Sequence, residues 1–271
     1  NNPELRAAYN AMLPKVSDFF ASIPLNERLW KIIKAYSKVK NNDRLSKTKE
    51  HYLQETLTDF REAGADLNLN KKKRLREIQS QLAKLTQKYS ENCLDATNSW
   101  EKIITDINQL SGLPQSAIAA ARQSAKQKGK KGWRFTLQAP SYISVMTYLD
   151  SNAIRKEIWQ AYSSVGRTSN YDNRRIVRKI LDLRHELAQL LGHRNFADYV
   201  TGRRMAGSGS AALDFVNKLF NKVRLQSESE AATLKKFKVK IEAHHNAECS
   251  HFLEAWEVAY WAEKQRRANY N

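Results

Sequence analysis

KKKRLREIQSQLAKLTQKYSENCLDATNSWEKIIT, residues 71–105, carries an apolar side chain at every third or fourth position. These side chains are Leu75, Ile78, Leu82, Leu85, Tyr89, Cys93, Ala96, Trp100 and Ile103. Such spacing aligns them along one face of a helix, or of two abutting helices. Because no glycine or proline interrupts the stretch, we expect a long rod that packs antiparallel to neighbouring helices.

Helical spacing continues along most of the chain. Nine glycines and five prolines are few for 271 residues, so loops should be short. The expected fold is mainly α, a multi-helix lobe over 1–271, with a hinge at the polar linker 164–171 around Gly166. Helices are predicted over residues 29–36, 52–60, 115–128, 142–149, 153–163, 172–192, 213–241 and 254–271.

One segment breaks the helical pattern. Residues 133–138 alternate Trp133, Phe135 and Leu137 with polar side chains, which is the period of a half-buried strand. A single strand cannot satisfy both of its edges. Its partner is therefore expected elsewhere in this fold, or in residues outside the sequence given.

The formal net charge of +18 raises the question of a polyanionic partner. Basic runs occur at 71–74, 126–131, 235–240 and 266–267, each in or beside a predicted helix with carboxylates nearby. Charge runs of this kind are usually solvated helix faces, which is the interpretation we favour. Binding of a polyanion such as nucleic acid stays open as an alternative.

Composition also bears on location. The two cysteines, Cys93 and Cys249, have no C-x-x-C partner, which is typical of a reduced protein. No apolar run approaches the length of a membrane span, and no signal peptide is present. We expect a cytoplasmic protein without a membrane partner. Because the chain begins at Asn1 and not at methionine, we also expect further residues upstream.

The segment His185-Glu186-Leu187-Ala188-Gln189 is one residue short of the zinc-protease motif H-E-x-x-H. That motif sets two histidines one helical turn apart on Zn²⁺, with a glutamate that activates water. At position 189 the neutral amide of glutamine is a poor zinc ligand. We therefore predict no metal, cofactor or catalytic residue here, and a helix surface or a polar contact instead.

A second cluster carries donor types that zinc prefers. Its members are His244, His245, Glu248, Cys249 and His251, with helical i, i+4 pairs among them. A structural zinc site needs four rigid ligands, and this segment resembles a connection between helices. An exposed polar loop is the favoured interpretation, with adventitious metal binding as the alternative. Neither a G-x-S-x-G elbow nor a nucleotide-binding glycine pattern is present.

Several segments resemble one peptidase family, in the order that the family has them. They are residues 2–13 (NPELRAAYNAML), 89–100 (YSENCLDATNSW), 112–121, 140–148 (PSYISVMTY), 184–192 (RHELAQLLG) and 259–267 (AYWAEKQRR). The family is that of thimet oligopeptidase and oligopeptidase A, the M3 zinc metallopeptidases that trim short peptides. Two features depart from it, the high positive charge and Glu254-Ala255-Trp256-Glu257, where proline before and aspartate after the tryptophan are usual.

The resemblance implies a helical architecture of two lobes around a deep channel. It implies that this chain forms much of the lobe remote from the zinc, and that the zinc ligands, catalytic glutamate and substrate-binding residues lie beyond Asn271. We expect an interior fragment or degenerate relative of a zinc oligopeptidase for short peptides, inactive on its own. The alternatives are a non-catalytic helical module that binds peptide or protein, and a polyanion binder.

The last expectation concerns the segment 254–270. Trp256, Tyr260 and Trp261 form an apolar face with no following chain in the sequence to cover it. Large exposed apolar patches tend to find partners. Self-association, or docking of a missing catalytic segment on this helix, is therefore expected.

Overall fold

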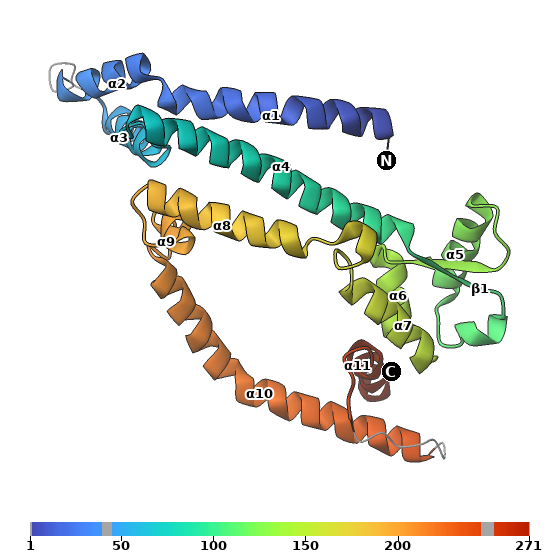
Figure 1. Ribbon diagram of the computed structural model, residues 1–271. Helices are drawn as coiled ribbons and strands as arrows, with labels where there is room; N and C mark the ends of the chain where they lie inside the picture. The colour runs from blue at the N-terminus through green and yellow to red at the C-terminus, as the bar shows by residue number, and fades with distance from the viewer. Residues whose placement is uncertain (1, 40–44, 245–251, 271) are drawn as a thin grey trace. The chain divides into compact units, whose positions relative to one another are not determined.

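The computed structural model describes residues 2–39, 45–244 and 252–270. It is 76% helical, and its described part contains a single two-stranded antiparallel sheet, which confirms the mainly α prediction. The chain forms two compact units. Unit 1 comprises Asn1–Ser90 and Arg174–Asp214, and unit 2 comprises Glu91–Asn173 and Phe215–Asn271. The ribbon is shown in Figure 1.

Unit 1 is built from helices alone in its described part. They are α1 (Pro3–Leu25), α2 (Glu27–Val39), α3 (Lys47–Glu62), most of α4 (Leu69–Ser99), α8 (Arg174–Leu190), α9 (Phe196–Thr201) and the first turns of α10 (Gly209–His244). The first half of α4 lies beside α8 (Figure 1). Leu75 and Ile78, both fully buried, pack there with Leu183 and Leu187, as the apolar spacing of the sequence predicts.

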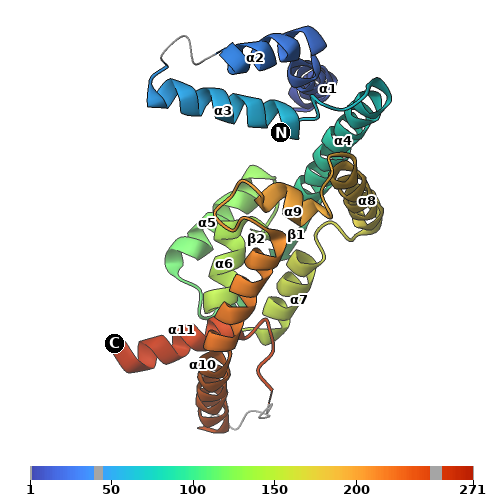
Figure 2. The same ribbon diagram turned by 90° about the vertical axis from the view of Figure 1, so that its left-hand side faces the viewer.

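Unit 2 contains the sheet and the helices around it. Its elements are β1 (Glu101–Ile104), the 3-10 turn η2 (Ile107–Leu110), α5 (Gln115–Gln127), β2 (Trp133–Thr136), α6 (Ala139–Tyr148), α7 (Asn152–Ser163), the 3-10 turn η3 (Ser169–Tyr171), most of α10 and α11 (Val258–Tyr270). Figure 2 shows β2 beside α5 and α6. Phe135, Val145, Leu149 and Ile158 are almost fully buried in the core between these elements.

The predicted helix over 71–105 is wrong at its end. Helix α4 stops at Ser99, and Glu101–Ile104 forms β1, paired antiparallel with β2 so that Lys102 faces Phe135 and Ile104 faces Trp133. The pattern of residues 101–104, two charged residues followed by two isoleucines, fits either a helical turn or a short strand. They form a strand because β2 needs a pairing partner. The partner of the predicted strand thus lies in this fold.

The expectation of an exposed apolar face on 254–270 is also wrong. Tyr260 and Trp261 are only 8% and 7% exposed, because they pack on Leu234 of α10. Trp256 is half-buried, and its indole nitrogen donates to Asn152 Oδ1 at 2.7 Å. The helix therefore covers its own unit, and the surface on which the self-association prediction rested is not available.

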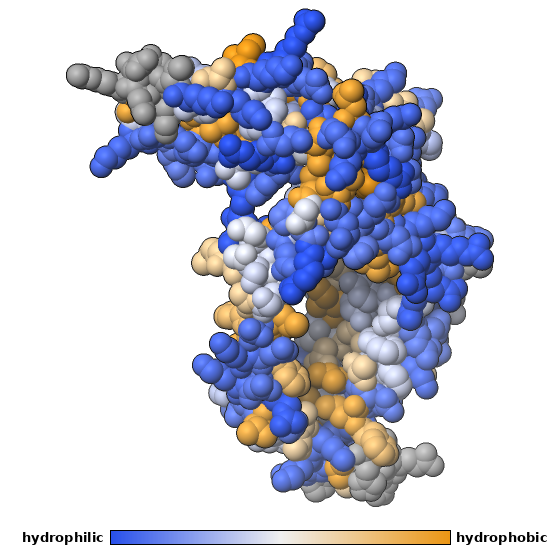
Figure 3. Space-filling view, turned by 60° about the vertical axis from the view of Figure 1, so that its left-hand side comes forward, coloured by the Kyte–Doolittle hydropathy of each residue, from blue (hydrophilic) through white to orange (hydrophobic). Residues whose placement is uncertain are grey.

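Sequence reasoning did not single out α1 as a helix. Asn2 caps it by accepting from the backbone nitrogens of Glu4 and Leu5. Pro14 and Pro24 lie inside it, which explains the weak signal. Several of its large apolar side chains are more than half exposed: Leu5, Tyr9, Met12, Phe19 and Phe20. Figure 3 shows such apolar patches among hydrophilic side chains on one face of the molecule.

The hinge expected over 164–171 stays a prediction, as does the single lobe over 1–271. The linker contains Gly166, whose φ of +75° is a left-handed conformation that favours glycine. The backbone nitrogen of Asn173 donates to Gly166 O at 2.8 Å, which closes the segment just before the chain passes into unit 1.

The carboxylate of Asp150 yields a prediction about stability and pH. It accepts hydrogen bonds from Ser111 Oγ (2.7 Å) and Tyr260 OH (2.8 Å) and pairs with Lys264. Burial opposes its ionisation, but these partners outweigh burial and hold the pKa of Asp150 below its usual value. Because the pKa is lowered on folding, the stabilisation is present above the ordinary aspartate pKa and is lost as the pH falls through the folded value.

We therefore expect Asp150→Asn to lower the free energy of unfolding by about 1–2 kcal/mol at pH 7. The difference from wild type should shrink as the pH falls below about 3.9. Urea unfolding at a series of pH values measures both. Asp182→Asn, at an exposed position of α8, is the control and should change neither. A penalty for Asp150→Asn that does not vary with pH would contradict the role of the ionised carboxylate.

Candidate functional site

The near-motif at 185–189 lies on α8 in unit 1. Leu183 and Leu187 point into the core with Leu75 and Ile78, so the apolar face of α8 is already occupied. His185 and Gln189 are exposed, and Glu186 is half-buried. The segment is therefore a polar helix face, in agreement with the favoured interpretation of the sequence.

Arg74 of α4 engages the central glutamate of the near-motif. Its Nε donates to Glu186 Oε1 at 2.6 Å and its Nη2 to Oε2 at 2.7 Å, so both carboxylate oxygens are bound in a bidentate pair. The hydrogen bonds that Arg74 donates lower the pKa of Glu186, and donating to Glu186 and Glu77 raises the pKa of Arg74. A carboxylate held in this way joins α4 to α8 and is a poor base.

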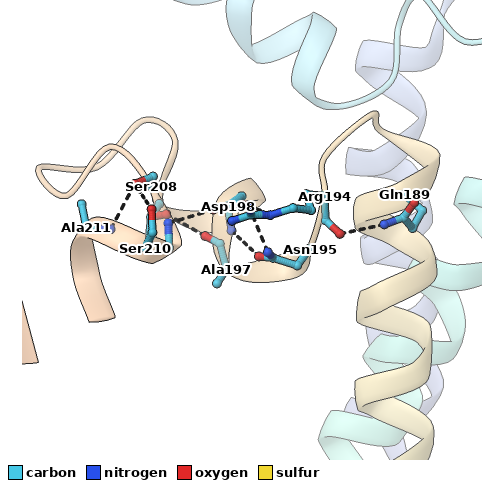
Figure 4. Close-up of polar contacts among 10 residues, drawn as sticks. Gln189, Arg194, Asn195, Ala197, Asp198, Ser208, Ser210 and Ala211 are labelled. Carbon is cyan, nitrogen blue, oxygen red and sulfur yellow. Dashed lines mark hydrogen bonds and ion pairs between the residues drawn. The ribbon is translucent and has the colours of Figure 1, made fainter. Parts of the chain in front are cut away.

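Gln189 also has a structural partner. Its side-chain Nε2 donates to the backbone oxygen of Arg194 at 2.7 Å, which ties the end of α8 to the turn before α9 (Figure 4). Beyond the turn, Asp198 Oδ2 accepts from Asn195 Nδ2 at 3.0 Å and from Arg194 Nε at 3.2 Å. Asp198 Oδ1 accepts from the backbone nitrogen of Gly209 at 2.9 Å, where α10 begins. This network orders the α8–α9–α10 connection.

These residues do not fit a zinc ion. A catalytic site needs three protein ligands, and here position 189 offers only an amide, which donates to Arg194. The glutamate that would activate water is bound by Arg74. Within 2–39, 45–244 and 252–270, no group of three or more histidine, cysteine, aspartate or glutamate side chains could hold a metal ion. The second cluster, His244 to His251, lies outside the residues whose side chains the structure describes.

Unit 2 contains a groove that the sequence did not reveal. It has a volume of about 540 Å³ and lies between α5, β2 and α6. Its lining residues are small or polar for the most part: Ser116, Ala117, Ala120, Ser124, Arg134, Thr136, Ser141 and Ser144. Sequence reasoning missed it because the groove depends on how three separate elements pack. Its volume is in the range typical of sites for small ligands, about 300–1,000 Å³.

A second cavity in unit 2 is basic. It has a volume of about 370 Å³ at the turn from α5 to β2 and is lined by Arg122, Lys126, Lys130 and Lys131, with Gly129 and Gly132. Lys130 pairs with Glu101 of β1. Lys126 lies in the last turn of α5 and Lys131 follows it, where positive charge is favoured by the helix dipole.

The sequence of this chain is similar to those of known peptidases. Residues 145–271 match the sequence model of peptidase family M3. Oligopeptidase A of Escherichia coli is 38% identical over the whole of this chain, and the aligned part is 40% of that protein. The chain is an oligopeptidase A-like sequence of peptidase family M3.

More distant relatives agree with this placement. The probable cytosolic oligopeptidase A of Arabidopsis thaliana is 31% identical over the whole chain and 39% of its own length. Dipeptidyl carboxypeptidase of E. coli is 26% identical over 77% of this chain and 30% of its own length. This oligopeptidase A-like chain thus spans about two fifths of the length of the curated relatives that it matches over its whole length.

The geometry of the near-motif leads to a prediction about metal. We expect the dialysed oligopeptidase A-like chain to retain no stoichiometric zinc when measured by mass spectrometry. Gln189→His completes the H-E-x-x-H pattern but should not create a tight zinc site, because a third ligand is not provided by the described residues. One tightly bound zinc per wild-type chain, lost on His185→Ala, would contradict this assignment.

Proposed function

We propose that this oligopeptidase A-like chain is a helical, non-catalytic part of an enzyme that hydrolyses short peptides. Family membership supports the peptidase context. The single observation that supports the non-catalytic role is the state of the near-motif, where Glu186 is bound at both oxygens by Arg74. The 271 residues contain no other segment that approaches H-E-x-x-H.

In this proposal the chain contributes a rigid wall that helps to hold the substrate in position. Buried apolar contacts fix α4 against α8 in unit 1, and the core of unit 2 fixes α5, β2 and α6 around the groove. Peptidases obtain much of their rate from holding the substrate in one position. A rigid helical wall serves that purpose without contributing a reacting group.

A non-catalytic module that binds peptide or protein for its own sake is the alternative. Both proposals require the same helical surface. They differ in whether that surface lies beside the catalytic centre of a peptidase or binds its ligand without any hydrolysis. The comparison that separates them is therefore whether the chain can stand in for the aligned stretch of an active relative.

Polyanion binding is favoured by one observation, the basic cavity lined by Arg122, Lys126 and Lys131. Elsewhere some basic side chains are paired within the fold, since Glu263 pairs with Arg266 and Arg267 and Arg203 pairs with Glu55 and Asp59. Phosphate contacts weaken steeply with salt. Binding of an oligonucleotide at 50 mM salt that disappears at 200 mM, and on Lys126→Ala, would support this second function.

The cytoplasmic location stays a prediction. No described helix is long and apolar enough to cross a membrane. One plant relative is named cytosolic and another chloroplastic or mitochondrial, so the names of relatives do not choose between compartments.

The proposal predicts the outcome of two activity measurements. The chain alone, with added zinc, should not hydrolyse an internally quenched short peptide above the rate without protein. A chimera of E. coli oligopeptidase A, in which this chain replaces the aligned stretch, should hydrolyse the same peptide. Chelator-sensitive hydrolysis by the chain alone would contradict the non-catalytic role. A chimera that has the circular dichroism of the parent and no activity would favour the separate binding module.

A further inference from the structure

We propose that the free edge of β2, between α5 and α6, binds an extended segment of a peptide through backbone hydrogen bonds. The inference deepens the proposed function and rests on it for the choice of a peptide as ligand. It assigns a peptide-binding site to the 540 Å³ groove of unit 2.

The backbone of β2 alternates between its two edges. In an antiparallel pair, the N–H and C=O groups of one residue point to the partner strand and those of the next point away. Thr136 N–H donates to Ser141 Oγ at 3.0 Å and so points away from β1. Arg134, two residues earlier, presents its N–H and C=O on the same outer edge.

On this outer edge the N–H of Thr136 is already bound by Ser141 Oγ, which leaves Arg134 as the position for a ligand. Because Arg134 and Thr136 are in step along the strand, the N–H and C=O of Arg134 are turned away from β1 as well. Arg134 and Thr136 both line the groove, so the outer edge of β2 borders it. Exposed strand edges of this kind are templates for a further strand.

The walls suit a strand in size and chemistry. Ala117 and Ala120 of α5 lie on one wall and Ser141 and Ser144 of α6 on the other, so the groove is wide because its side chains are short. Ser116 of α5 and Ser144 of α6 add hydroxyl groups to the two walls. Addition of a peptide strand to a free sheet edge is a recurring mode of peptide recognition, in which the backbone supplies affinity and pockets read alternate side chains.

Charge limits the ligand to uncharged segments. Among the described residues that line the groove, only Arg134 carries a charge, and it is occupied. Its Nε donates to Glu101 Oε2 at 2.6 Å and its Nη1 to Ser124 Oγ at 2.9 Å. The expected ligand is therefore an extended peptide with small, neutral side chains.

Two variants at position 134 distinguish the effect of the backbone N–H on binding from the effect of the side chain. Arg134→Ala removes the ion pair with Glu101 but keeps the N–H, whereas Arg134→Pro removes both. Proline is tolerated where the N–H of a strand faces away from its partner, so both variants should fold. The probe is a short fluorescein-labelled peptide of alternating alanine and threonine, and binding is measured by fluorescence anisotropy on the full chain.

We expect Arg134→Ala to bind the probe within about twofold of wild type. Arg134→Pro should bind about fivefold more weakly, the effect of one net hydrogen bond. A probe with N-methylated backbone amides should bind neither the wild type nor the Ala variant measurably. Equal binding by the Ala and Pro variants, or no binding of the probe by wild type, would overturn the inference.

A second pair on α5 tests the groove itself and does not touch the strand. Ala120→Leu fills the groove, whereas Ala119→Leu adds the same side chain at an exposed neighbour outside it. Only the first should weaken binding of the probe, and equal effects of the two would overturn the site. These binding measurements do not depend on hydrolysis. The activity assay can therefore contradict the non-catalytic proposal while the groove still binds the probe. Equally, the groove can fail to bind the probe while the activity assay agrees with the non-catalytic proposal.

Discussion

A buried ion pair within unit 2 joins Lys238 of α10 to Glu257, directly before α11. Lys238 Nζ lies 2.7 Å from Glu257 Oε2 and also donates to the backbone oxygen of Phe252, and the two side chains are only 1% and 2% exposed. Asn152 Nδ2 donates to the other carboxylate oxygen of Glu257 at 3.1 Å. Two charges removed from water require this degree of pairing, since an unpaired buried charge would cost several kcal/mol.

A second buried cation in unit 2 positions one wall of the groove. Arg155 of α7, 2% exposed, donates to the backbone oxygens of Leu149 and Asp150 at the end of α6 and lies 4.0 Å from the ring centre of Tyr260 in α11. Burial lowers the pKa of the Arg155 guanidinium, while Tyr260, Glu257 and Asp150 act to keep it charged. Helix α6 is thereby held in place, and α6 provides one wall of the groove.

Much of this could be predicted from sequence, and the failures share a cause. The spacing from Leu75 to Leu85 gave the α4 face that packs on α8, because periodicity reports burial directly. The same spacing misled at Ile103, where the pairing of β1 with β2 overrides a local pattern. Likewise, neither the bidentate pair of Arg74 with Glu186 nor the burial of Trp261 can be seen in one segment alone, since each joins parts distant in sequence.

A double-mutant cycle on Lys238→Met and Glu257→Leu tests the central interaction most directly, by urea unfolding of the singles, the double and the exposed control Lys236→Met. Lys238→Met leaves Glu257 buried without its cation, and Glu257→Leu leaves Lys238 with the more distant Glu242 Oε1 at 3.8 Å. Each single variant should lose about 3–5 kcal/mol of unfolding free energy. The double variant removes both charges, so its loss should fall short of the sum of the two by more than about 1 kcal/mol. Losses that add to within about 0.5 kcal/mol would show that the two charges do not depend on each other, and would contradict this account.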